Sequence, residues 1–163
     1  MSNSPFLIRA VTRADVPNLF DLIKALAEYE KLSHAVTGDV KALEHDLFCE
    51  KPCIEAIVAE CDRKPVGFAL FFTNYSTFLT KSGIYLEDLF VLPDYRGRSI
   101  GKALIVQVAK IALERGCGRL EWAVLDWNLP AIAFYERMGA DILTDWRICR
   151  VTGESLQEFA QKS

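Results

Sequence analysis

Apolar residues recur along the chain at two spacings, and each spacing predicts a different kind of element. Short dense apolar runs and alternation with a period of two are typical of strands, whereas apolar residues three and four apart are typical of amphipathic helices. We therefore expect strands at residues 6–11, 54–60, 66–72, 85–92 and 120–125, with one or two more in 141–151. Helices are expected from residue 14 onward, with Leu19, Leu22, Ile23 and Leu26 on one face, and at residues 40–49, 102–115, 128–138 and 154–161.

Turn-forming residues separate these elements. Residues 62–65 predict a hairpin turn, residues 74–83 a polar loop, and Gly116 and Gly139 mark the ends of helices. Asn128 is suited to cap a helix and Pro130 to its first turn. The resulting order predicts an α/β fold: a mixed, mostly antiparallel sheet flanked by helices, in a single domain over residues 1–163.

Composition narrows the functional classes. The 163 residues are 51% hydrophobic and 25% charged, which is typical of a globular protein. A formal net charge of −3 and a pI of about 5.5 argue against a nucleic-acid partner. Five cysteines without a C-x-x-C pair, together with only two histidines, argue against a metal site. The apolar runs are too short to span a membrane, and the first residues lack the pattern of a signal peptide, so we expect a cytoplasmic protein.

The loop R-G-R-S-I-G at residues 96–101 joins an apolar strand to an amphipathic helix. The first turn of a helix leaves backbone N–H groups without intrahelical partners, and glycines let a ligand approach that backbone closely. With Arg96 and Arg98 adding positive charge, the loop is suited to hold a pyrophosphate. The alternative is a surface loop with two solvated arginines. The P-loop and dinucleotide-binding patterns are both absent.

Two acidic residues, Glu87 and Asp88, interrupt the apolar strand. Strand alternation would send them to opposite faces, and charges in such a strand are costly unless they are paired or face a polar pocket. We interpret Glu87 as a candidate general base and substrate contact, with Asp88 orienting its neighbours. The alternative is a structural role, in which one acid pairs with an arginine or caps a loop.

A helical face carries Asn128, Ala131 and Tyr135, which are spaced i, i+3 and i+7. A tyrosine phenol can act as a general acid. The alternative is that Phe134 and Tyr135 are core aromatics.

The loop, together with these segments, resembles the R-x-x-G-x-G/A motif of the GNAT N-acetyltransferases, with Arg96 and Gly101 in matching positions. Ser99 stands where that family has its middle glycine, and we expect it to adopt an ordinary helix-entry conformation. The resemblance implies the GNAT fold and acetyl-CoA as the co-substrate. It implies CoA contacts from the backbone of Leu89, Phe90 and Val91, from the loop residues Arg96, Gly97, Arg98, Ser99, Ile100, Gly101 and Lys102, and from Asn128, Ala131 and Tyr135. Tyr135 would then protonate the CoA thiolate after direct attack by the amine.

Four blocks, LIKALAEYEKL, YLEDLFVLPDYRG, AVLDWN and FYERMGA, resemble the diamine (spermidine/spermine) and thialysine acetyltransferase branch of this family. That resemblance implies a homodimer and amine-site contacts from Tyr29, Glu30, Glu87, Asp88, Glu121, Trp122 and Ala123. Polyamine-specific members carry acidic residues in the loop before the central strand, whereas residues 75–79 here contain none. We therefore expect a thialysine-like amino acid or a short diamine as the acceptor, in preference to spermine.

Three other functions are compatible with the same residues. An acetyltransferase acting on the amines of peptides or proteins would need an open groove. A non-catalytic acyl-CoA sensor would bind the co-substrate without turnover. A nucleotide-binding protein would use the same loop for another pyrophosphate.

Overall fold

The computed structural model describes residues 5–162, so Met1 to Ser4, at the start of the segment inspected for a signal peptide, lie outside the described residues. The chain forms two compact units, one up to Ala123 and one from Val124 onward. None of the helices in residues 5–162 is long and apolar enough to cross a membrane.

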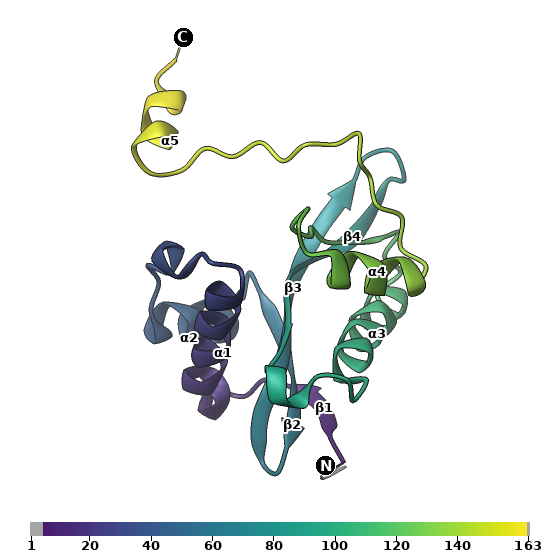
Figure 1. Ribbon diagram of the computed structural model, residues 1–163. Helices are drawn as coiled ribbons and strands as arrows, with labels where there is room; N and C mark the ends of the chain where they lie inside the picture. The colour runs from purple at the N-terminus through teal and green to yellow at the C-terminus, as the bar shows by residue number, and fades with distance from the viewer. Residues whose placement is uncertain (1–4, 163) are drawn as a thin grey trace. The chain divides into compact units, whose positions relative to one another are not determined.

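The first unit contains a five-stranded sheet in the order β1-β2-β3-β4-β5, antiparallel except for the parallel pair β4–β5. This mixed sheet confirms the predicted fold class. Helices α1 and α2 lie on one side of it, and α3 lies on the other (Figure 1). The elements are β1 (Leu7–Ala10), α1 (Val16–Tyr29), α2 (Val40–Phe48), β2 (Glu55–Cys61), β3 (Lys64–Ser76), β4 (Lys81–Val91), α3 (Ile100–Glu114) and β5 (Leu120–Glu121), with short 3-10 turns at Arg13–Asp15, Ser33–Ala35 and Pro93–Tyr95.

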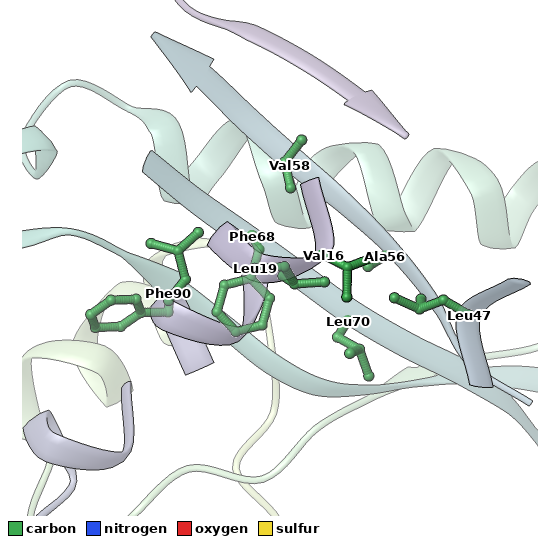
Figure 2. Packing of buried hydrophobic residues seen from close by; sticks show 9 residues of the cluster. Val16, Leu19, Leu47, Ala56, Val58, Phe68, Leu70 and Phe90 are labelled. Carbon is green, nitrogen blue, oxygen red and sulfur yellow. The ribbon is translucent and has the colours of Figure 1, made fainter. Parts of the chain in front are cut away.

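One hydrophobic core lies between the sheet and the helices α1 and α2. Figure 2 shows Val16 and Leu19 of α1 beside Phe68 and Leu70 of β3. The remaining buried members of this cluster are Leu22, Leu47, Ala56, Val58 and Phe90. The predicted apolar face of the first helix is confirmed, because Leu19 and Leu22 are buried and Ile23 and Leu26 pack against the cluster. This packing fixes α1 against the sheet, and so fixes the helix end that carries Tyr29.

The start of α1 is fixed by a second, polar contact. The Arg9 guanidinium donates to both carboxylate oxygens of Asp15, at 2.7 and 2.9 Å, and to Glu60 of β2. Asp15 also accepts from the Thr12 backbone N–H at 2.8 Å. These hydrogen bonds hold the pKa of Asp15 well below its usual range, with Arg9 as the main cause. The network therefore joins β1, β2 and the entry to α1 while the carboxylates are ionised.

The prediction of a polar loop over residues 74–83 is wrong. β3 continues to Ser76 and β4 begins at Lys81, so only residues 77–80 form the turn. The strands extend because Asn74 pairs with Gly83 and Ser76 with Lys81, although the side chains in this part of the hairpin are mostly polar. Polar side chains on an exposed hairpin do not prevent backbone pairing.

The second unit contains α4 (Leu129–Arg137) and α5 (Gly153–Ala160), both as predicted, with Gly139 at φ +90° after α4. The strands predicted in 141–151 are wrong, because no strand occurs in the described part of this unit. The prediction at 120–125 is correct only for Leu120 and Glu121. A strand needs a neighbour for its backbone hydrogen bonds, and an apolar sequence pattern does not supply one.

Candidate functional site

The loop between β4 and α3 presents backbone N–H groups at its end. Ser99 precedes α3 as its N-cap residue, and its side chain makes no capping hydrogen bond. The N–H groups of the first helical turn therefore have no side-chain acceptor from the cap. Together with the helix dipole, these donors favour a negatively charged group at this end of α3.

The glycines of this loop leave space beside the backbone. A Cβ atom built on Gly97 would meet nothing within 4 Å, and one on Gly101 would meet only Cγ2 of Val91, at 3.9 Å. The protein's own side chains therefore do not fill this side of the loop. Lys102 and Ser99 are exposed beside it, and Ile100 is buried and anchors the helix. A phosphate-bearing cofactor such as CoA fits these residues.

Ser99 differs from the sequence expectation. Its backbone has φ +61° and ψ +12°, which is the left-handed region and not an ordinary helix-entry conformation. Glycine adopts this conformation readily, whereas a residue with a Cβ atom pays for it. The loop needs the conformation to turn from the 3-10 turn at Pro93–Tyr95 into α3. Serine therefore occupies a position that favours glycine.

The two arginines of the loop lie against aromatic rings. The Arg96 guanidinium stands 4.7 Å from the ring centroid of Tyr29 and 5.4 Å from that of Phe90. Its Nε donates to the Val91 carbonyl oxygen at 2.9 Å. Arg98 lies 5.2 Å from the ring centroid of Tyr95. Both guanidinium groups therefore contact aromatic rings, and Arg96 remains exposed to solvent.

A β-bulge in β4 determines the position of Asp88. Leu70 pairs with Asp88 and Phe71 with Leu86, so Glu87 is the extra residue on β4. Directly opposite residues share a face of an antiparallel sheet, and Leu70 belongs to the core under α1. Asp88 therefore lies on the α1 side, where strict alternation would have placed it on the α3 side with Leu86. The alternation assumed for Glu87 and Asp88 is interrupted.

Three carboxyl groups interact near this bulge. Glu87 is exposed, and Asp88 and Glu30 are half-buried. Burial, followed by the negative charges of Glu87 and Glu30, raises the pKa of Asp88 to about 7. Burial also raises the pKa of Glu30. Among residues 5–162, none of the three has an ion-pair partner. The arrangement is an uncompensated acidic cluster beside the apolar core.

Within the part of the chain that the structure describes, β4 has a strand on both sides only at its start. Its parallel ladder with β5 consists of Ile84 with Leu120 and Tyr85 with Glu121. From Leu86 to Val91 the strand pairs with β3 alone. The backbone of Leu89, Phe90 and Val91, predicted to contact CoA, therefore has no strand beside it on the β5 side within the first unit.

Of the three residues predicted to contact the amine near β5, only Glu121 belongs to the strand. The Glu121 carboxylate accepts from the Asn74 side chain at 3.0 Å and lies 3.1 Å from the Arg119 Nε. It is therefore occupied by partners within the protein. Trp122 and Ala123 follow the strand and do not form part of it.

The second unit carries the other predicted residues on α4. The Asn128 side chain accepts from the Ala131 N–H, at 3.4 Å, and so caps the helix as predicted. The Tyr135 and Phe134 ring centroids are 5.3 Å apart. Among residues 5–162, no three His, Cys, Asp or Glu side chains come together as metal ligands.

Comparison with known proteins identifies relatives over nearly the whole chain. The model of the acetyltransferase (GNAT) family matches residues 21–140. A thialysine N-epsilon-acetyltransferase from Bos taurus is 42% identical, covering 96% of this chain and 98% of its own. An L-ornithine N5-acetyltransferase from Arabidopsis thaliana is 34% identical, covering 92% and 86%. The solved structure of an integron cassette protein from V. cholerae has a TM-score of 0.80 at 26% identity, covering 96% and 98%.

The left-handed backbone at Ser99 predicts how substitutions there will behave. Ser99→Gly removes a conformational cost of about 1–2 kcal/mol but adds about 0.4–1 kcal/mol of unfolded-state entropy. We expect the free energy of unfolding, measured by chemical denaturation, to stay unchanged or rise by up to about 1.5 kcal/mol. Ser99→Val, with a β-branched side chain, should lower it by about 1–3 kcal/mol. A valine variant as stable as the wild type would contradict the left-handed conformation.

Proposed function

The chain belongs to the acetyltransferase (GNAT) family as an acyl-CoA-dependent N-acetyltransferase, and we propose that its acceptor is the primary amine of a small molecule. A thialysine-like amino acid or a short diamine fits best. The relatives named for thialysine and ornithine support this acceptor class. The absence of carboxylates in residues 75–79 supports a short acceptor over a long polyamine.

The observation that carries this proposal is the acidic cluster of Glu30, Glu87 and Asp88. Grouped carboxylates beside an apolar core are costly when no cation accompanies them. No ion pair within residues 5–162 neutralises these three. An incoming ammonium group would supply the missing charge, so the cluster favours cationic acceptors. Tyr29, next to Glu30, and residues 121–123 would complete the contacts around the acceptor.

The reacting amine must lose a proton before it attacks. An alkyl ammonium has a pKa of about 10.4, so holding it neutral at pH 7 costs about 4–5 kcal/mol. Glu87, exposed at the bulge, takes this proton directly or through water. Asp88 and Glu30 hold the acceptor in place. Because the pKa of Asp88 is about 7, its charge changes within the physiological range.

The loop of residues 96–102 would hold the pyrophosphate of acetyl-CoA, with the helix N–H groups of α3 as donors and Arg96, Arg98 and Lys102 as charges. Acetyl-CoA supplies a thioester acetyl group that is open to attack by a neutral amine. The backbone of Leu89, Phe90 and Val91 would contact the cofactor's chain and give an N–H donor to the developing oxyanion. The open space beside Gly97 and Gly101 supports this placement.

Residues of α4 complete the proposal on the strength of family resemblance. Asn128 and Ala131 would lie along the pantetheine chain of CoA. Tyr135 would give its phenol proton to the departing sulfur, so that Glu87 removes one proton and Tyr135 delivers one. A phenol keeps its hydroxyl proton at neutral pH and can therefore donate it to the sulfur.

We also propose a homodimer. The resemblance to the diamine and thialysine acetyltransferase branch supports this proposal. The family model runs through residues 21–140, which supports a single acetyltransferase domain over residues 1–163. A cytoplasmic location stays a prediction from the sequence.

The acceptor class is tested by measuring release of the CoA thiol with thialysine, lysine, ornithine, putrescine, spermidine and a basic peptide. We expect the highest kcat/KM for a small ω-amino acid or a short diamine, because the acidic cluster is compact. Turnover with the peptide alone would contradict the small-molecule proposal. Saturable acetyl-CoA binding without turnover on any acceptor would favour an acyl-CoA sensor.

Asp88→Asn tests the acidic cluster through its pH dependence. A carboxyl whose pKa is raised on folding binds extra protons in the folded state, so it lowers stability as the pH rises from about 4 to about 7. The variant should lack this decline and exceed the wild type at pH 8 by up to about 4 kcal/mol in unfolding free energy. At the same pH, its kcat/KM for the amine should fall at least tenfold.

Asp46→Asn on α2 is the matched control for the same denaturation and activity measurements. It removes an aspartate outside the proposed site and should change neither profile. A difference between Asp88→Asn and wild type that stays constant from pH 5 to pH 8 would contradict the titration of Asp88 in this range.

Tyr135→Phe tests the general acid. The variant keeps the ring and its contact with Phe134 but loses the proton donor, so kcat should fall about 10²-fold. The Kd of acetyl-CoA, measured calorimetrically, should stay within about twofold because the ring remains. Tyr75→Phe, at the exposed hairpin, serves as the control. Wild-type turnover in Tyr135→Phe would remove this role from Tyr135.

A further inference from the structure

The side chain of Arg96 connects two parts of the first unit that are far apart in the sequence. Tyr29 ends α1 and lies beside Glu30, whereas Arg96 begins the loop that leads into α3. The guanidinium lies 4.7 Å from the Tyr29 ring centroid and 5.4 Å from the Phe90 ring centroid. A guanidinium within about 6 Å of an aromatic ring is attracted by the ring electrons. Arg96 is therefore held by rings from α1 and from β4.

The hydrogen bond of Arg96 restricts it further. Its Nε donates to the carbonyl oxygen of Val91, at 2.9 Å. This is the only hydrogen bond that the structure shows for this side chain within residues 5–162. A guanidinium has five N–H donors, so those of the two Nη groups stay available. The rings and the carbonyl orient the side chain, and the Nη groups keep the capacity to bind an anion.

Tyr29 therefore adjoins Glu30 of the proposed acceptor site, while its ring supports Arg96 of the proposed cofactor loop. We infer that Tyr29 is a positioning residue for the cofactor loop, acting through Arg96, in addition to any contact with the amine. The inference rests on the proposed binding of CoA by residues 96–102. Removing the ring would let Arg96 sample other rotamers, and binding an anion would then cost more side-chain entropy.

If the amine and CoA bind as proposed, this arrangement would also couple their binding. An amine that contacts Tyr29 or Glu30 restrains the end of α1, and the same ring restrains Arg96. Binding of the amine should then favour binding of CoA, and by thermodynamic reciprocity CoA should favour the amine to the same extent. The contact would transmit this effect through a single ring and no change of fold.

The test is CoA affinity measured by isothermal titration calorimetry in the absence of any amine. Tyr29→Leu should weaken CoA binding about three- to tenfold, because the cation–π contact is lost. Tyr29→Phe should stay within about twofold, because the ring remains. Phe20→Leu is the matched control, since Lys24 lies over its ring at 5.5 Å on the same helix but away from the loop. It should leave CoA affinity unchanged.

The outcomes separate this inference from the proposed function. Absence of CoA binding by the wild type would overturn the proposed function itself. Wild-type CoA affinity in Tyr29→Leu, with a raised KM for the amine alone, would overturn only the positioning role. An equal loss in Tyr29→Phe and Tyr29→Leu would also overturn it, because the hydroxyl and not the ring would then matter.

If thermal melting followed by circular dichroism shows that Tyr29→Leu is poorly folded, Tyr29→Met replaces it, because an unbranched side chain fills the space but has no ring. A double-mutant cycle with Arg96→Gln, which removes the cation, gives a second measurement, and Arg96→Gln should weaken CoA binding by itself. In the Arg96→Gln background, Tyr29→Phe and Tyr29→Met should bind CoA with equal affinity, because no guanidinium remains to contact the ring. Fully additive effects of Arg96→Gln and Tyr29→Met would contradict a contact between the two residues.

Discussion

The pairing of β4 with β3 shifts by one residue at Glu87, and the position of Asp88 in the acidic cluster depends on this shift. Before the bulge, Leu86 occupies the side away from the α1 core. After it, Asp88 and Phe90 lie on the α1 side, opposite Leu70 and Phe68. A strand without the extra residue would turn Asp88 toward the α3 side and leave the end of α1 without an acidic neighbour. One inserted residue therefore brings an acid from the middle of the sheet toward a helix end formed almost sixty residues earlier.

The same arrangement lowers the stability of the folded protein once Asp88 is ionised. Burying Asp88 near Glu30 and Glu87 raises its pKa, which means that its ionised form is disfavoured in the folded protein. The packed core of Val16, Leu19 and Phe68 offsets that cost, as does the Arg9 network at the entry to α1. Active sites are commonly less stable than their surroundings allow, because the groups that bind a ligand lack partners until the ligand arrives. Here the carboxyl group of Asp88 and the core under α1 lie on the same face of the sheet.

The sequence predicted most helices and the central strand, because these depend on local periodicity. The phosphate-binding role of residues 96–101, inferred from helix-end chemistry, stays a prediction. It could not predict the bulge at Glu87, since a bulge is defined by the register with another strand. It missed the contact of Arg96 with Tyr29 and Phe90, because that contact depends on the tertiary packing of α1. It misjudged Ser99, since serine in a left-handed conformation leaves no periodic signal. It also predicted more strand after residue 120 than the structure contains, because apolar alternation there has no neighbouring strand to pair with.

The short ladder between β4 and β5 has a consequence for local unfolding. Only two residue pairs join these strands, whereas β3 and β4 pair from Gly67–Val91 to Ser76–Lys81. Segments with few cooperative hydrogen bonds open at a lower free energy than those in long ladders. Amide protons between β4 and β5 should therefore exchange with solvent sooner than those between β3 and β4. A cofactor that bound beside β4 would slow that exchange by mass action. The exchange rate of the amides between β4 and β5 would then show whether the cofactor is bound, whereas the exchange rate in the β3–β4 hairpin would not change.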